Sequence, residues 1–415
     1  MSAGVLSPRA RLAVLAAAFS GLVFDGVELG LMPVASLSVS KHLLGSAYTP
    51  TLGGDWFARF TAALMLGAAI GGIAFGNLGD RIGRARAMGV SILFYSMFAG
   101  LGAFVKTQEQ MLVLRFIVGL GAGGVWPNGV ALVSECWPNA SRPLISGVTM
   151  AGLNAGILLL SQMARIGTIA PDSWRWIFKL AAVPAVLGVL VLVALPESPK
   201  WLAARGASKQ PTPPLRELFR PGLLRMTLAG VVISSIPMIG AWAASKWMIP
   251  WADKVAGPAL PSYKAVTQGW WALGAMLGCV VGAQVAHTLG RRASYFLMSV
   301  GTTVLTVVMF QLTTPLHASF LPVVFAQGFT ATLFFGWLTL YLPELFPIHV
   351  RATGTGLAYN SGRFATAAGV MVAGTLFAAL GGDYPKVGAL CAMVYALGMI
   401  AIWWAPDTSS RTMDE

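Results

Sequence analysis

Charged residues are scarce in this chain. Only 10% of its 415 residues are Asp, Glu, Lys or Arg, and 56% are hydrophobic. Soluble domains carry about 25% charged residues, so the composition excludes a soluble protein. Hydrophobic runs of about 20 residues, long enough to cross a bilayer core, recur along the whole sequence. These runs are longer than membrane strands, and we expect an all-α integral membrane protein with twelve spanning helices, near 12–37, 57–78, 87–105, 110–134, 143–164, 175–195, 227–249, 265–286, 294–314, 318–342, 353–380 and 387–405.

Cysteine and histidine are also few. The three cysteines lie in or beside predicted spans, with a spacing that fits neither a metal site nor a disulfide framework. The four histidines lie in or near loops, and no span pairs a serine or cysteine with a histidine. An intramembrane enzyme would need a nucleophile with its base, or a set of metal ligands. We therefore expect no enzyme, no metal and no cofactor.

The basic residues are distributed unevenly among the loops. The net charge is +13, and arginines gather in every second inter-span segment, beginning with the N-terminus: Arg9, Arg11, Arg81, Arg84, Arg86, Arg142, Arg291, Arg292, Arg351 and Arg411. The stretch 200–225 adds six more basic residues, and the alternate loops are poorer in them. Positive charge marks cytoplasmic loops. We predict a multi-pass protein of the cytoplasmic (inner) membrane with both termini in the cytoplasm, and no binding of nucleic acid.

An internal repeat divides the spans into two sets of six. The polar stretch ESPKWLAARGASKQPTPPLRELFR separates them, so we predict an N-terminal six-helix bundle over 1–196, a cytoplasmic linker over 197–225 and a C-terminal six-helix bundle over 226–415. A shift of 207 residues aligns Gly67, Gly71, Gly83 and Arg84 with Gly274, Gly278, Gly290 and Arg291. A shift of 209 aligns Glu135, Pro138, Arg142 and Gly147 with Glu344, Pro347, Arg351 and Gly356. Parallel repeats of six helices build one class of secondary transporters.

Several motifs resemble those of a known family. GNLGDRIGRARA (76–87) is similar to the signature between helices 2 and 3 of major facilitator superfamily transporters, and VAHTLGRR (285–292) is its decayed copy. LPESPKWL (195–202) resembles the end of helix 6 in sugar porters and organic-acid symporters. The segments 115–135 and 341–363 resemble organic-acid symporters, and DGVE (25–28) resembles the D-G-[YF]-D motif of aromatic acid and sialate proton symporters. The resemblance implies the major facilitator fold, with two six-helix pseudo-repeats.

Two carboxylates, Asp25 and Glu28, interrupt the first hydrophobic run. Each ionised acid in mid-membrane costs roughly 2.5–3.5 kcal/mol, and the spacing of three residues puts both on one helix face. A carboxyl group that gains and loses a proton there suits proton-coupled transport. The alternative is a permanent structural pair, chiefly with Arg115. By resemblance, Arg115 in helix 4 pairs with the helix 1 acid and takes part in coupling.

Arg363 is the predicted anion-binding residue. It lies about three turns inside helix 11, where a guanidinium can bind a carboxylate through two hydrogen bonds. The alternative is a bond to backbone carbonyls near the cytoplasmic side. Other predicted substrate contacts are Asn360, Tyr359, Trp337, Trp271 and Lys246, although the aromatic side chains can equally serve packing. Lys246 is expected near the outer end, where its side chain can extend to the membrane surface instead.

The loops that carry the repeated motifs predict a gate. Gly76 and Gly83 permit tight backbone approach, and Asp80 can pair with arginines or helix N-termini across the cytoplasmic gate, to which Arg84 also belongs. The pairs Glu135–Arg142 and Glu344–Arg351 are predicted to form similar latches. The sequence GLGAGG (119–124) contains a G-x-G-x-x-G pattern, but within an apolar helix it predicts close helix packing rather than dinucleotide binding.

The leading hypothesis is a proton-coupled symporter of a small organic anion, such as an aromatic, sugar or other carboxylic acid, that works by alternating access. A sugar porter for a neutral hexose remains an alternative, because LPESPKWL occurs in both groups. A transporter-like receptor is normally marked by a long additional cytoplasmic domain. The expected partners are the substrate, protons and the lipid bilayer, with the protein acting as a monomer.

Overall fold

The computed structural model describes residues 6–137, 142–206, 215–347 and 350–408. Within these residues the regular structure is helical, and twelve segments are long and apolar enough to cross a membrane, as predicted. Several spans consist of two or more consecutive helices. The helices of the N-terminal half are α1 (Pro8–Leu44), α2 (Pro50–Ile82), α3 (Arg84–Leu101), α4 (Gln108–Ala122), α5 (Val125–Cys136), α6 (Arg142–Ile166), α7 (Arg175–Leu180) and α8 (Ala185–Ala194).

The C-terminal half holds the other six spans. Its helices are α10 (Pro221–Ile239), the π-helix η4 (Gly240–Ala244), the 3₁₀-helix η5 (Ser245–Trp247), α11 (Met248–Ala256), α12 (Tyr263–Leu289), α13 (Arg291–Gln311), α14 (Phe320–Leu345), α15 (Arg351–Ala379) and α16 (Tyr384–Trp404). Between the halves, the described parts of the predicted linker form α9 (Pro199–Gly206) and the 3₁₀-helix η3 (Leu215–Phe219), while 207–214 lies outside the described residues. The domain boundaries at 197 and 225 stay a prediction.

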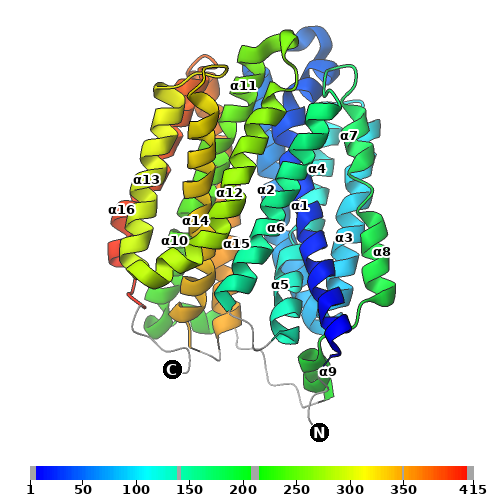
Figure 1. Cartoon of the computed structure of the whole chain (residues 1–415), viewed down its shortest axis with the longest axis vertical. Helices are drawn as coiled ribbons and strands as arrows, with labels where there is room; N and C mark the ends of the chain where they lie inside the picture. Colours follow the sequence, from blue (N-terminus) through cyan, green and yellow to red (C-terminus); the bar gives the residue numbers. More distant parts are fainter. Residues whose placement is uncertain (1–5, 138–141, 207–214, 348–349, 409–415) are drawn as a thin grey trace.

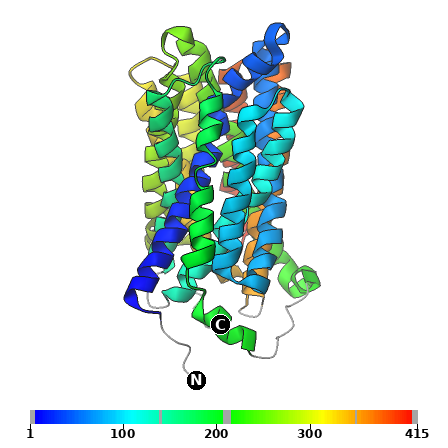
Figure 2. The ribbon, with the colours of Figure 1, turned by 90° about the vertical axis from the view of Figure 1, so that its right-hand side faces the viewer.

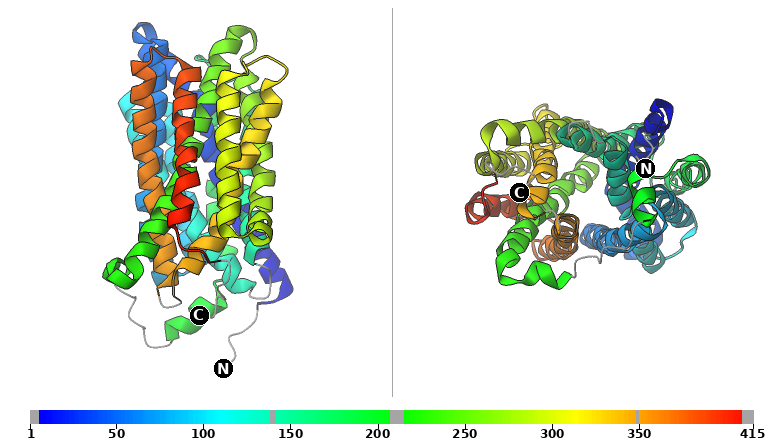
Figure 3. Two further views of the ribbon diagram at one scale, coloured as in Figure 1. Left: turned by 90° about the vertical axis from the view of Figure 1, so that its left-hand side faces the viewer. Right: turned by 90° about the horizontal axis from the view of Figure 1, so that it is seen from below.

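The helices stand side by side with both ends of the chain on one side. The first turn of α1, the last turn of α16 and the short α9 all lie at this end, which we call the terminal end (Figures 1 and 2). We call the opposite end the distal end. Seen from the terminal end, the blue-to-teal helices and the yellow-to-red helices form two groups (Figure 3). Helix α2 packs on α15, and α6 packs on α12, so these pairs join the halves.

The repeated glycines explain how each half is packed. A Cβ atom added to Gly67 of α2 would lie 2.1 Å from the carbonyl oxygen of Phe116 in α4. The repeat counterpart Gly274 of α12 is equally close, 2.1 Å, to the carbonyl oxygen of Phe325 in α14. Small residues let membrane helices approach this closely. The internal repeat seen in the sequence is therefore a repeat of helix contacts.

The GLGAGG segment serves packing, as predicted. Cβ atoms at Gly119 and Gly123 would meet the carbonyl oxygens of Leu64 and Ala68 in α2 at 2.3 and 2.2 Å. The helix is interrupted just beyond, where α4 ends at Ala122 and α5 begins at Val125. No side chain larger than hydrogen fits at either glycine.

The seventh span is broken where it passes the centre of the protein. After Pro237 in α10, the chain forms the π-turn η4 and then the 3₁₀-turn η5 before α11 begins. Gly240 starts this break, and a Cβ there would lie 2.4 Å from the ring of Tyr395 in α16. Interrupted helices and π-bulges often mark functional sites. The break alters the direction of the side chains that follow it, including Lys246.

Candidate substrate cavity

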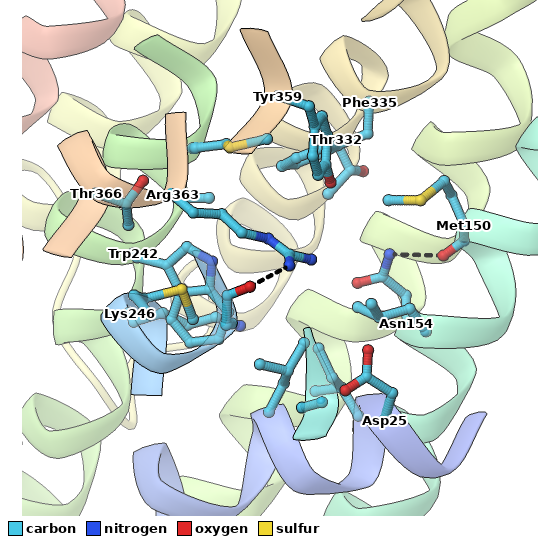
Figure 4. Close-up of a pocket in the computed structure, with 18 of the residues that line it drawn as sticks. Asp25, Met150, Asn154, Trp242, Lys246, Thr332, Phe335, Tyr359, Arg363 and Thr366 are labelled. Carbon is cyan, nitrogen blue, oxygen red and sulfur yellow. Dashed lines mark hydrogen bonds between the residues drawn. The ribbon is translucent and has the colours of Figure 1, made fainter. Parts of the chain in front are cut away.

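A cavity lies between the two halves (Figure 4). Its wall is mostly apolar, and three lining residues carry charge: Asp25 from the N-terminal half, and Lys246 and Arg363 from the C-terminal half. The neutral lining residues are Leu29, Met65, Ala68, Ala122, Met150, Leu153, Asn154, Ile157, Met238, Ala241, Trp242, Trp271, Thr332, Phe335, Tyr359 and Thr366. An apolar pocket with a few converging polar groups is the usual form of a small-molecule site.

Asp25 lies near the middle of α1 and is 2% exposed. Within the described part of the chain, its Oδ1 atom has no hydrogen-bond partner. The next residue, Gly26, fixes the helix in place, because a Cβ there would lie 1.8 Å from the carbonyl oxygen of Leu153 in α6. Asp25 is thus a buried acid on a rigid backbone, with one oxygen available to a proton or a ligand.

Glu28 has a different environment. Its Oε1 atom accepts a hydrogen bond from Nη1 of Arg115 in α4, and each side chain is 1% exposed. The resemblance implied that Arg115 pairs with an acid of helix 1. In the structure that partner is Glu28, so the alternative of a buried pair with Arg115 is found for Glu28 and not for Asp25. Glu28 does not line the cavity, whereas Asp25 does.

Arg363 extends from α15 into the cavity (Figure 4). Its Nη1 atom donates to the carbonyl oxygen of Ala68 in α2, at 3.0 Å, so the expected backbone bond exists but crosses between the halves. The guanidinium carbon lies 5.5 Å from the ring centroid of Tyr359, one turn earlier. A guanidinium carries five N–H donors. The bond to Ala68 therefore uses a small part of its capacity and holds the head group in the cavity.

The expectation that Lys246 lies near the outer end is wrong. Lys246 is 1% exposed and lines the cavity, because the break in the seventh span turns it inward. Its Nζ atom lies 3.3 Å from the ring centroid of Trp271 and 5.7 Å from that of Trp242. Among the described residues, this nitrogen has no hydrogen-bond partner.

The other predicted substrate contacts divide into two groups. Trp271 and Tyr359 line the cavity. The indole N–H of Trp271 donates a hydrogen bond to Gln327 at 2.7 Å. The ring of Tyr359 stacks on Trp126 of α5, with ring centroids 4.5 Å apart. Trp337 and Asn360 are not among the residues that line it, so their role as substrate contacts stays a prediction.

These two residues have packing roles that explain the difference. Trp337 is fully buried in the C-terminal half, where its Nε1 donates to Ser294 and its ring stacks on Tyr341. Asn360 points at α2, and a Cβ on Gly72 would lie 2.7 Å from its Oδ1. Neutral lining residues such as Asn154 and Thr332 were not predicted, because nothing in the sequence distinguishes them from packing residues.

The terminal end carries ion pairs at corresponding positions of the two halves. In the N-terminal half, Arg84 pairs with Asp80 at 2.5 Å and approaches Glu135 at 3.5 Å. In the C-terminal half, Arg291 pairs with Glu344 at 2.7 Å. Arg291 and Glu344 are the repeat counterparts of Arg84 and Glu135. Asp80 thus pairs with an arginine, but each of these pairs lies within one half, so the contact across the gate stays a prediction.

The other predicted latch arginines are Arg351 and Arg142. Arg351 donates from Nε to the carbonyl oxygen of Phe346 at 3.2 Å, and the side chain of Arg142 lies outside the described residues. A Cβ at Gly76 would meet nothing within 4 Å, so the predicted close approach at this glycine is wrong. Gly83 does have a reason to be glycine, since its φ is +111° and a Cβ would lie 2.1 Å from Oε2 of Glu197.

Glu197, from the LPESPKWL motif, caps the start of α3. Its carboxylate accepts from the backbone N–H of Ala85 at 3.0 Å and of Arg86 at 3.5 Å. Trp201 of α9 donates from its indole to the carbonyl oxygen of Asp80 at 2.9 Å. A carboxylate at a helix N-terminus is stabilised by the helix dipole and the free N–H groups. The motif thus attaches α9 and the end of the sixth span to the signature loop.

The sequence is also similar to known proteins. Residues 13–369 match the family model described as Major Facilitator Superfamily. The chain is 30% identical over 407 residues to a probable 4-methylmuconolactone transporter of Cupriavidus pinatubonensis, covering 94% of this chain and 90% of that protein. It is 28% identical to a cis,cis-muconate transport protein of Acinetobacter baylyi, with 92% of each chain covered. An arabinose-proton symporter of Bacillus subtilis is 24% identical, over 72% of each chain.

Proposed function

Because this chain belongs to the major facilitator superfamily and is a multi-pass membrane transporter rather than an enzyme, we propose that it is a proton-coupled symporter of a small organic anion. It works by alternating access in the cytoplasmic membrane, with the terminal end in the cytoplasm. Asp25 carries the proton and Arg363 binds the anion.

One observation carries this proposal: Asp25 and Arg363 face the same cavity from opposite halves of the protein (Figure 4). A protonated Asp25 leaves the positive charges of the C-terminal half free to bind an anion. An ionised Asp25 competes with that anion for the same charges. Proton and substrate therefore favour each other's binding, which is the condition for symport.

Contacts on both sides of the cavity support alternating access. Toward the distal end, Lys264 of α12 donates to Ser38 of α1 at 3.1 Å, and Trp247 packs against Phe57 of α2 with ring centroids 5.3 Å apart. Toward the terminal end, the stacked rings of Trp126 and Tyr359 join the halves. Opening the cavity to either side requires breaking one of these sets while the other holds.

The names of two relatives support an organic acid over a neutral sugar. They are named for cis,cis-muconate and 4-methylmuconolactone, and the cavity of this chain holds two cationic side chains. A sugar site needs many neutral hydrogen-bonding groups, whereas the amide and hydroxyl groups of this lining, apart from Tyr359, are Asn154, Thr332 and Thr366. The similarity to an arabinose-proton symporter makes arabinose the appropriate counter-test.

The proposal is tested by uptake into proteoliposomes that contain the purified protein. We expect uptake of labelled cis,cis-muconate to exceed uptake of arabinose and to increase as the external pH is lowered. Asp25→Asn abolishes accumulation driven by the proton gradient but retains part of the substrate exchange. Asp55→Asn is a matched control, because Asp55 pairs with Arg59 outside the cavity at 2.7 Å. Uptake of arabinose in place of the acid, or gradient-driven accumulation in Asp25→Asn at the wild-type level, contradicts the proposal.

A further inference from the structure

We propose that the preferred substrate is a dicarboxylate, with one carboxylate bound by Arg363 and the other by Lys246. This inference rests on the proposed function, because it assigns the substrate class of the same cavity. It adds a second anion-binding residue and a requirement for two negative charges on one ligand.

The first argument is the unsatisfied charge of Lys246. An ammonium group has three N–H donors, and among the described residues its Nζ makes no hydrogen bond, although the side chain is 1% exposed. The contact with Trp271, at 3.3 Å from the ring centroid, is a cation–π interaction, which is weaker than the cost of burying an ion. The ring therefore offsets only part of this cost, and a ligand anion would supply the rest.

The second argument is the charge balance of the cavity. Its basic side chains are Lys246 and Arg363, with Asp25 opposite them. When Asp25 carries a proton, the wall has two positive charges, and a dianion neutralises both. With the proton and the dianion both bound, the charges of the two cations and the ligand sum to zero during transport. A monoanion under the same conditions leaves one buried cation without a partner.

The third argument is that the two cationic side chains belong to separate elements of the fold. Lys246 comes from η5 in the broken seventh span and Arg363 from α15, with the side chains of Trp242 and Thr366 also on this wall (Figure 4). Each cation has its own anchoring contact, Trp271 for Lys246 and the Ala68 carbonyl for Arg363. Separate anchors position two anion sites for the two ends of one molecule, with apolar lining for the part between them.

The test compares acids that differ only in their second carboxylate. Binding to the purified protein is measured by calorimetry at one pH. The diacids butanedioate to octanedioate are compared with the monoacids butanoate to octanoate. Muconate is likewise compared with sorbate, and terephthalate with benzoate. We expect the best diacid to bind about tenfold or more tightly than its monoacid partner, as befits one charge-assisted hydrogen-bonded pair.

Two substitutions then assign the effect to the lysine. Lys246→Met removes the charge and keeps an apolar side chain of similar length. We expect the affinity for the diacid to fall to that of its monoacid partner. The affinity for the monoacid itself is expected to change less than about twofold. Lys246→Arg restores most of the preference. Lys179→Met, at an exposed position of α7, is the control and leaves both affinities unchanged.

The outcomes separate this inference from the proposed function. If monoacids bind as tightly as diacids in the wild-type protein, the dicarboxylate inference is overturned while organic-anion transport stands. If the preference for diacids persists in Lys246→Met, the assignment to Lys246 is overturned. If no acid of either series binds while arabinose does, both proposals fail. The comparison in the wild-type protein requires no variant, so poor folding of Lys246→Met does not prevent the test.

Discussion

Arg115 of α4 donates a hydrogen bond to Glu28 of α1, and both side chains are almost completely buried. Glu28 is one acid of the DGVE motif, and the other acid, Asp25, lines the cavity. The two carboxylates share a helix face yet have different surroundings. In the proposed function, Glu28 neutralises Arg115 and Asp25 exchanges the proton.

The buried pair makes a prediction about stability. Glu28→Gln leaves Arg115 as an unpaired buried charge, and Arg115→Met leaves Glu28 in the same state. Removing one partner of a buried pair costs about 3–5 kcal/mol, whereas replacing both costs much less. We expect each single variant to lower the unfolding temperature of the purified protein strongly, and the double variant to recover most of the loss. Losses that simply add in the double variant would show that the two side chains do not stabilise each other.

The geometry of Arg363 predicts that lysine cannot replace it. A lysine side chain at this position would keep the charge and the reach to the Ala68 carbonyl, but it lacks the planar fork that binds a carboxylate through two bonds. We expect Arg363→Lys to reduce uptake of the best organic anion by about tenfold or more, with normal expression. Arg165→Lys, at an exposed position on α6, serves as the control. Uptake at the wild-type level in Arg363→Lys would assign the anion to another residue.

The ion pairs at the terminal end predict an effect on turnover rather than on binding. Asp80 pairs with Arg84, which also approaches Glu135, and none of these residues lines the cavity. Asp80→Asn alters the packing of the signature loop, and thereby the equilibrium between conformations, without touching the substrate. We expect the maximal transport rate to fall severalfold while the half-saturating substrate concentration changes less than about twofold. A large loss of affinity at an unchanged maximal rate would refute this role.

The sequence predicted the elements that lipid and close packing dictate. Run lengths located the twelve spans, and the spacing of Gly67 and Gly274 revealed the repeat, because each glycine faces a backbone carbonyl of a neighbouring helix. The cavity was less predictable. The inward direction of Lys246 depends on the turns η4 and η5, which the hydrophobic pattern does not reveal. Trp337 was assigned to the cavity because a buried tryptophan looks the same in sequence whether it faces a ligand or Tyr341.

A polar contact that no motif indicated joins the halves toward the distal end. Lys264 of α12 lies between Asp253 of the C-terminal half, at 3.2 Å, and Ser38 of α1, at 3.1 Å. Ser38 in turn donates to the carbonyl oxygen of Ile169, so its oxygen is directed toward the lysine. Lys264 is 4% exposed and Ser38 is 3% exposed, which shields the bond from competing water. The bond joins the halves and must break when the cavity opens to the distal side.

Removing this bond is expected to shift the protein toward the distal-open conformation. A hydrogen bond from a charged group contributes about 1.5–3 kcal/mol, enough to change a two-state equilibrium by tenfold or more. Ser38→Ala therefore increases the population with separated distal ends. Spin labels on cysteines introduced at the exposed positions Lys41 and Lys386 report this as a growing long-distance peak. Lys106→Met, which removes an exposed charge elsewhere, leaves the distribution as in the wild type. An unchanged distribution in Ser38→Ala would mean that the apolar contact between Phe57 and Trp247 closes the distal end without the hydrogen bond.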